Sequence, residues 1–126
     1  MLLVKTKIGS SKISGIGLFA DQFISKGTLI WKFQEGFDLL LSAQEMEKLS
    51  EPAKAQFINY AYLDTKRNQY LLCSDDARFF NHSKNPNCDD SKDDETTSLQ
   101  DITKGEELTV DYNGFCGNLE DHPEVN

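Results

Sequence analysis

The sequence contains no apolar run long enough to cross a membrane. Even an apolar-rich stretch such as Phe37–Leu41 falls far short of the roughly 20 residues that a membrane-spanning helix requires. The apolar residues at the N-terminus stop before Lys5, so they also lack the pattern of a secretory signal peptide. We therefore expect a soluble intracellular protein of the cytoplasm or nucleus, with no membrane partner.

Cysteine is scarce in this chain. Its three cysteines, Cys73, Cys88 and Cys116, are odd in number and widely spaced. This pattern fits neither a disulfide framework nor a local zinc site. Reduced thiols in an intracellular protein are the expected state.

Clusters of basic residues are also missing. The chain has 13 Lys and Arg against 21 Asp and Glu, which gives a formal net charge of -8. Such a surface repels phosphates, so we expect no direct binding to nucleic acid. A basic partner such as a lysine-rich peptide is the better electrostatic match, although the same charge would also keep a small protein soluble.

The length and the residue pattern predict one domain that is mainly β with short helices. A chain of 126 residues can bury a sizeable core without disulfides or metals. Short apolar runs broken by glycine, serine and polar turns are typical of short strands. The expected strands lie within 2–8, 18–33, 60–63, 69–73, 96–102 and 107–112.

The remaining segments predict helices and loops. Ser42 to Glu45 match a capping box, which predicts one helix or two short ones interrupted near Pro52. A further short helical segment is expected after Asp75. The acidic stretch Asp89–Glu95 predicts a hairpin loop.

Three segments carry residues that suit a binding or catalytic site. Gly15 and Gly17 allow close approach of the backbone to a ligand, although in isolation they favour a tight structural turn. Asn81 and His82 offer donors and acceptors that could orient a cofactor, or could belong to a locally satisfied polar loop. Tyr112 ends an apolar strand, where it could be a core aromatic or place its hydroxyl against a reacting group.

Taken together and in this order, the three segments resemble the SET-domain family of protein-lysine methyltransferases. Gly15–Ala20 is similar to its glycine motif, and Gly105–Tyr112 is similar to its terminal motif. Arg78–Ser83, with Pro86 and Asn87, is similar to its Arg-Phe-x-Asn-His-Ser motif. The resemblance implies a fold of small curved β-sheets with a C-terminal pseudoknot, formed by residues 1–126 as a single SET domain.

The resemblance also implies a function and its residues. The expected activity is methyl transfer from S-adenosylmethionine to a protein lysine, with Tyr112 as the catalytic tyrosine. Tyr62, Tyr112 and Leu99 would line the channel for the lysine side chain. The implied cofactor-binding residues are Gly15, Ile16, Gly17, Tyr60, Asn81, His82 and Phe115.

The chain departs from many members of that family in its cysteines. Lys84 follows Asn-His-Ser where those members carry a cysteine, and the short post-SET-like tail 113–126 has only Cys116. We therefore expect no zinc and no other metal. Phe115, or another residue of this tail, would close the site by packing on the cofactor.

Several alternatives remain open at the level of the sequence. A non-catalytic module that binds lysine-containing peptides would have the same fold, although the presence of Asn81, His82 and Tyr112 favours the enzyme. The substrate could be a histone or another basic protein, and a homodimer could complete the peptide groove. The sequence does not give the target lysine or the number of methyl groups transferred.

Overall fold

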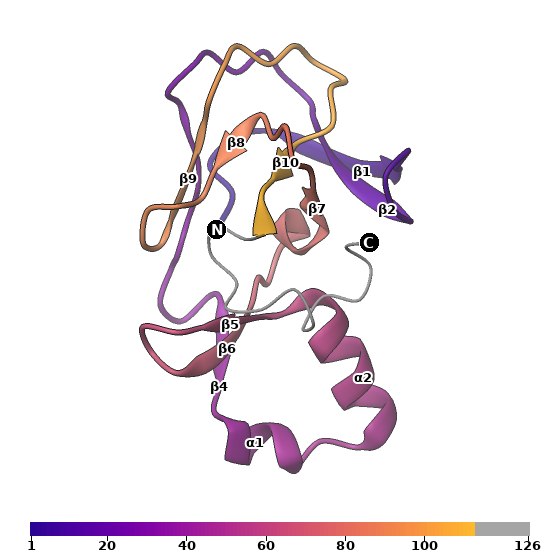
Figure 1. The fold of residues 1–126 in the computed structure, drawn as a ribbon, viewed down its shortest axis with the longest axis vertical. Coiled ribbons are helices and arrows are strands. Elements are labelled where there is room, and N and C mark those ends of the chain that lie inside the picture. The colour runs from indigo at the N-terminus through magenta and orange to yellow at the C-terminus, as the bar shows by residue number, and fades with distance from the viewer. Residues whose placement is uncertain (113–126) are drawn as a thin grey trace.

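The computed structural model describes residues 1–112, which form small sheets joined by short helices (Figure 1). The strands pair as β1-β2, β10-β7, β3-β9-β8 and β4-β6-β5. The first half comprises β1 (Thr6–Ser10), β2 (Ile16–Ala20), β3 (Leu29–Lys32), β4 (Leu39–Leu41), α1 (Ala43–Glu47) and α2 (Glu51–Tyr60). The second half comprises β5 (Tyr62–Asp64), β6 (Gln69–Leu72), the 3-10 helix η1 (Asp76–Phe79), β7 (Asn81–His82), β8 (Cys88–Asp89), β9 (Glu95–Ser98) and β10 (Thr109–Val110). The predicted mainly-β class with short helices is confirmed.

The predicted capping box starts the helical segment. The Ser42 side chain accepts from the Glu45 amide at 3.1 Å, and the Glu45 carboxylate accepts from the Ser42 amide at 2.9 Å. This reciprocal pair satisfies two amides that a helix start would otherwise leave open. The break between the two helices falls just before Pro52, which lies in the first turn of α2 with Ser50 as its N-cap.

Strand boundaries differ from the prediction at two sites that matter for function. Tyr60 was expected to begin a strand, but it ends α2, because the Ala61 amide still donates to the Phe57 carbonyl. The predicted strand 107–112 shortens to β10. It shortens because the Asn87 side chain bonds the Glu107 carbonyl at 2.8 Å and the Thr109 amide at 2.9 Å, in place of a strand partner.

The short parallel pair β7-β10 joins the second and third sequence motifs. Thr109 lies opposite Asn81, and Val110 lies opposite His82. The Ser83 amide extends the contact by donating to the Val110 carbonyl at 3.0 Å. Two motifs distant in the sequence therefore meet in one place, as the resemblance stated above implies.

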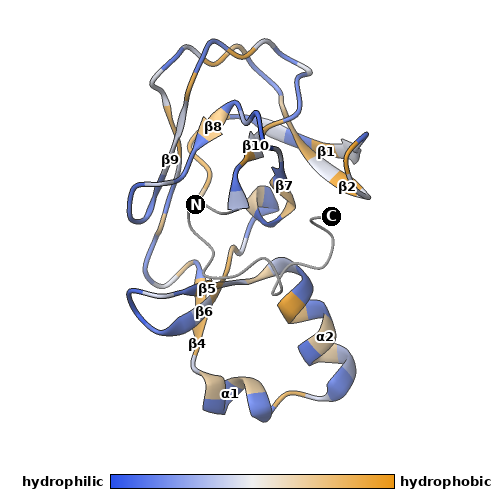
Figure 2. Ribbon diagram, viewed as in Figure 1, coloured by the Kyte–Doolittle hydropathy of each residue, from blue (hydrophilic) through white to orange (hydrophobic). Residues whose placement is uncertain are grey.

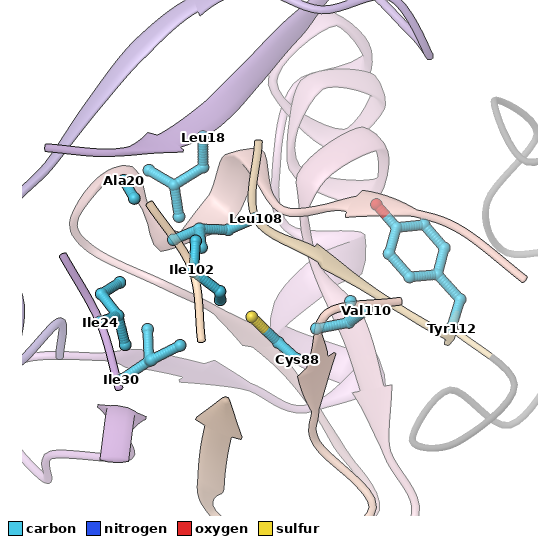
Figure 3. Packing of buried hydrophobic residues seen from close by; sticks show 9 residues of the cluster. All are labelled: Leu18, Ala20, Ile24, Ile30, Cys88, Ile102, Leu108, Val110 and Tyr112. Atoms are coloured by element: carbon cyan, nitrogen blue, oxygen red, sulfur yellow. The ribbon is translucent and has the colours of Figure 1, made fainter. Parts of the chain in front are cut away.

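The main core includes Val110 and therefore packs against the β7-β10 pair, which we call the junction. Its aliphatic members gather around Leu108 and Ile102, and Tyr112 stands at one end of the cluster (Figure 3). Burying each large aliphatic side chain contributes roughly 1.5–3 kcal/mol, so this cluster holds the junction in place. A second cluster surrounds Trp31 and Leu71, and a third packs the helices through Met46 and Phe57. No helix within residues 1–112 combines the length and apolar content that crossing a membrane would need.

Two hydrophilic loops, the β5-β6 turn and the β8-β9 loop, lie on the same side of the molecule (Figure 2). Arg67 of the first loop joins them through Asp94 of the second, at 2.8 Å, and also pairs with Asp64. Its guanidinium lies 4.4 Å above the ring of Phe33. These carboxylates raise the pKa of Arg67, and Arg67 lowers the pKa of Asp94. One cation thus fixes both loops.

Candidate functional site

A cavity of about 330 Å³ lies where the junction, η1 and the two hydrophilic loops meet. Its size falls within the usual range for small-molecule sites. It brings together residues from all three sequence motifs. The predicted site residues that line it are Gly15, Ile16, Tyr60, Tyr62, Asn81 and Tyr112.

The Asn81 side chain hydrogen-bonds to the loop that contains Gly15 and to Glu107, and so links that loop to the β7-β10 junction. Its amide nitrogen lies 2.9 Å from Glu107 Oε2, 3.1 Å from the Ser14 carbonyl and 3.3 Å from the Ile16 carbonyl. Glu107 in turn accepts from the Ser11 hydroxyl at 2.8 Å. We call Ser11, Asn81 and Glu107 the clamp. Because Asn81 is only 7% exposed, its main effect is to fix the loop that forms one wall of the cavity.

Gly17 faces the clamp, not the cavity. A Cβ atom at this position would lie 2.4 Å from Glu107 Oε2 and 2.9 Å from its Cδ. Only a residue without a side chain leaves room for the Glu107 carboxylate to reach Ser11 and Asn81. The motif glycine is thus explained by packing against Glu107. Gly15 has a different reason, because its φ of +45° favours glycine while the space beside it is open.

Replacing Gly17 with alanine should destabilise the protein by about 2 kcal/mol, because it overpacks a site held by several hydrogen bonds. Gly9 is the matched control, since it pairs with Gly17 across β1-β2 and an added Cβ there would meet Phe19 at an ordinary 3.5 Å. Chemical denaturation of both variants measures the difference. Removing the Glu107 side chain in the Gly17→Ala background should recover part of the loss, and equal losses for Gly9→Ala and Gly17→Ala would contradict the explanation.

Tyr112 is positioned by its backbone and by its hydroxyl. The Tyr112 amide donates to His82 Nδ1 at 3.0 Å, and the Tyr112 hydroxyl donates to the Phe80 carbonyl at 2.5 Å. The rings of His82 and Tyr112 lie 5.3 Å apart, and only Tyr112 lines the cavity. His82, which was predicted to bind the cofactor, does not line the cavity and instead holds the Tyr112 backbone through this hydrogen bond, so its role at the cofactor stays a prediction.

Of the other predicted site residues, two line the cavity and one lies outside it. Tyr60 packs edge-on against Phe79, with ring centroids 5.4 Å apart, and lines the cavity together with Tyr62. Leu99, which was predicted as a channel wall, directly follows β9, is 44% exposed and does not line this cavity, so its role in a lysine channel stays a prediction. Phe115 falls outside the described residues.

Asp90 is a wall residue that the sequence analysis did not identify. Burial, reinforced by the negative charges of Asp89 and Asp111, raises the pKa of its carboxyl to about 8. The sequence showed this residue only as part of an acidic loop. Its place directly after β8 (Cys88–Asp89) is known only from the structure.

Trp31 also lines the cavity, and its indole nitrogen has no hydrogen-bond partner among residues 1–112. Nearby, burial raises the pKa of the Cys73 thiol well above its usual range. Burial also raises the pKa of Cys88 to about 12. Both thiols therefore stay protonated and unreactive near neutral pH.

Residues 1–112 contain no group of three or more His, Cys, Asp or Glu side chains placed to hold a metal ion. The expected absence of zinc stays a prediction, because Cys116 lies outside this range. The cavity instead offers tyrosine rings, amide groups and carboxylates. Aromatic faces and carboxylates both stabilise cations, so this arrangement suits positively charged groups.

Comparisons with known proteins agree with the architecture. Residues 15–113 match the SET domain family. No curated protein sequence matches the chain. A Plasmodium falciparum protein provisionally assigned as a histone methyltransferase has a similar structure, with a TM-score of 0.60 at 20% identity over 88% of this chain and 95% of that chain.

Two further structures come from the Polycomb Repressive Complex 2 of Chaetomium thermophilum. The complex bound to the inhibitor GSK126 gives a TM-score of 0.67 at 20% identity. The autoinhibited complex bound to S-adenosylmethionine gives 0.66 at 21% identity. Both similarities cover 93% of this chain, which spans only 17% and 16% of those Polycomb chains.

Proposed function

Because the chain belongs to the SET-domain family, we propose that it transfers a methyl group from S-adenosylmethionine to the ε-amine of a protein lysine. The observation that carries the proposal is the convergence of the three sequence motifs on one cavity. Gly15, Asn81 and Tyr112 each contribute to its wall. The similar Polycomb structure bound to S-adenosylmethionine supports the choice of methyl donor.

The residues present fit this methyl donor. Its sulfonium is a cation, and the rings of Tyr60, Tyr62 and Tyr112 supply aromatic faces beside the cavity. The backbone at Gly15 and Ile16 would contact the rest of the donor, because the clamp holds this loop at the cavity wall. When bound, S-adenosylmethionine supplies an electrophilic methyl group.

The protein's own part in the reaction is alignment and desolvation. Holding two reactants in line can contribute roughly 7–11 kcal/mol to lowering the barrier. Tyr62 and Tyr112 would guide the lysine side chain, which must react as the neutral amine. A free lysine titrates near 10.4, so removal from water and a neighbouring positive charge are needed to favour its neutral form.

A lysine-rich segment is the substrate that the charge of the protein favours. The net charge of -8 attracts basic peptides, and the acidic loops lie at the cavity. Histone tails and other basic proteins both meet this description. The alternative is a module that binds such peptides without transferring a methyl group, and a search for turnover distinguishes the two.

The test combines binding and turnover on the full chain. Calorimetric titration with S-adenosylmethionine should give binding at one site per chain. Incubation with a mixture of core histones should then give lysine methylation that mass spectrometry detects as mass increments on the histones. Asn81→Asp should lose both signals, because it removes the donor of the clamp and places a second carboxylate beside Glu107.

The controls separate the outcomes. Asp21→Asn removes a carboxylate outside the cavity, where Asp21 pairs with Lys104 at 3.8 Å, and it should behave like the natural chain. Cofactor binding without methylation of any basic protein offered would favour the non-catalytic module. No binding of S-adenosylmethionine would rule out the proposed function.

A further inference from the structure

Two separate three-stranded sheets contribute to the cavity wall. One has the order β4-β6-β5 and supplies Tyr62 of β5, and the other has the order β3-β9-β8 and supplies Trp31 of β3 and Thr96 of β9. Tyr62 packs against the cluster around Trp31 and Leu71, which joins the two sheets through the core. The separation of the sheets therefore decides how much room this part of the cavity offers to a ligand.

Arg67 joins the same two sheets at their loops. It lies in the turn between β5 and β6, and its guanidinium donates two hydrogen bonds of 2.8 Å to the two carboxylate oxygens of Asp94 in the β8-β9 loop. The same guanidinium pairs with Asp64 at the end of β5 and lies 4.4 Å above the ring of Phe33, which directly follows β3. The Phe33 amide donates to the Asp94 carbonyl at 2.9 Å, so Asp94 is fixed to β3 as well as to Arg67. We call Arg67, Asp64, Asp94 and Phe33 the latch.

The geometry of the latch suits a rigid connection. The Arg67 side chain is 27% exposed, and the side chains of Asp64 and Asp94 are 12% and 34% exposed. A planar guanidinium that binds one carboxylate through two hydrogen bonds and stacks on an aromatic ring is held in one orientation. Lys66 and Asp93 join the same loops through a single contact of 3.2 Å, but their side chains are 64% and 71% exposed. An ion pair with such exposure contributes little to the connection.

The backbone beside Arg67 is also constrained. Within residues 1–112, Asn68 and Asp94 are the only residues other than glycine with a positive φ, at 55° and 63°. Asn68 directly follows Arg67, and Asp94 is its bidentate partner. Residues other than glycine keep this left-handed conformation where the surrounding contacts determine it. Both loops therefore have a defined shape at the point where Arg67 joins them.

We propose that Arg67 is a positioning residue that sets the width of the lysine-binding part of the cavity by holding the two sheets at a fixed separation. The inference rests on the proposed function. Arg67 does not line the cavity, so it would act through Tyr62 on one sheet and Trp31 on the other. The clamp, which shares no residue with the latch, holds the loop that contains Gly15. Removing the latch should therefore impair use of the lysine substrate and spare binding of the methyl donor.

The first test does not depend on turnover. Trp31 is the single tryptophan of the chain, so its fluorescence reports on this part of the cavity wall. Arg67→Gln should raise the rate constant for quenching of Trp31 by acrylamide roughly threefold, because a side chain that is 5% exposed becomes accessible when the sheets separate. Asp94→Asn should have a similar effect, since asparagine tolerates the positive φ but lacks the charge. The double variant should add little to either change, because both substitutions break the same contact.

Lys66→Gln is the matched control. Lys66 precedes Arg67 and carries the same charge, but its exposed pair with Asp93 contributes little. Quenching of Trp31 in this variant should equal that in the natural chain. Arg67→Lys keeps the charge without the planar fork, so it should fall between the natural chain and Arg67→Gln. Denaturation curves verify that all variants are folded at the temperature of the measurement.

The second test measures the two substrates separately. In Arg67→Gln, calorimetry should give one binding site for S-adenosylmethionine per chain and an affinity close to that of the natural chain, because the clamp is intact. The kcat for methylation of the histone mixture should fall roughly 10- to 100-fold, since a displaced wall misaligns the lysine side chain. Lys66→Gln should keep the natural kcat. A general loss of structure would instead lower the number of binding sites for the methyl donor.

The outcomes distinguish the inference from the proposed function. Quenching that is unchanged in Arg67→Gln, or that rises equally in Lys66→Gln, would overturn the inference even if the chain methylates lysine. Parallel losses of methyl-donor binding and turnover in Arg67→Gln would also overturn it, because Arg67 would then serve the whole fold. Raised quenching in Arg67→Gln, with no methylation of histones even by the natural chain, would support the latch and count against the proposed function alone. Raised quenching together with a selective loss of turnover would support both.

Discussion

Replacing Tyr112 with phenylalanine should lower the rate of methyl transfer by roughly 100-fold, the size of effect seen when one preorganised polar group is removed from a catalytic site. The ring would remain, so binding of S-adenosylmethionine should change only a few-fold. The lost group is a hydroxyl oxygen that is held at the cavity wall by its bond to the Phe80 carbonyl, 2.5 Å away. Single-turnover kinetics and calorimetry measure the two effects separately.

A stability control is needed, because the bond to Phe80 also contributes to folding. Its loss should cost about 1 kcal/mol, which is too little to unfold the protein at 25 °C. Tyr70→Phe is the matched control, since Tyr70 packs against the cluster around Met46 and Phe57 and does not line the cavity. Natural turnover by Tyr112→Phe, or equal losses in both variants, would remove Tyr112 from the catalytic role.

The second large effect is on stability as a function of pH. The pKa of Asp90 is about 8 in the folded protein, above its ordinary value of 3.8. The folded state therefore binds the proton more tightly than the unfolded state between these values. Stability from this group is fully present below pH 4, falls as the pH rises through 8, and then levels off.

Asp90→Asn should consequently be more stable than the natural chain at pH 9 and should match it more closely at pH 5. Each pKa unit corresponds to about 1.4 kcal/mol, so even half of the difference in pKa would be worth roughly 3 kcal/mol at pH 9. For a domain of this size the melting temperature should rise by roughly 10 °C. Calorimetric scans across this pH range, with Asp21→Asn as control, measure the change. Parallel pH dependence in the natural chain and Asp90→Asn would show that Asp90 titrates normally.

Much of the fold follows from local signals in the sequence. The capping box at Ser42 depends only on neighbouring residues, so it could be predicted without knowledge of the tertiary structure. The same holds for the loop after β8. The meeting of Asn81 with the terminal motif is different, because only the family resemblance predicted it. Apolar periodicity contains no information about which distant strands pair.

The errors and omissions have a common cause in tertiary contacts. Tyr60 has a residue type typical of strands, but one more helical hydrogen bond places it at the end of α2. Glu107 was not singled out within the terminal motif, although it accepts from Ser11 and Asn81. Asp90 looked like one more acid in a solvated loop. Each role depends on neighbours distant in the chain, which single-residue preferences do not reveal.

The clamp also has a consequence for how the protein folds. Ser11 and Glu107 are separated by 96 positions, so this contact closes a loop that spans most of the described chain. Contacts of such long range slow folding, because the entropy of loop closure is lost before the contact stabilises the chain. During synthesis the glycine loop and Asn81 leave the ribosome before Glu107 does. A nascent chain that stops short of Glu107 would therefore contain most of the cavity wall without the residue that holds the glycine loop, and binding competence would appear only once β10 has been made.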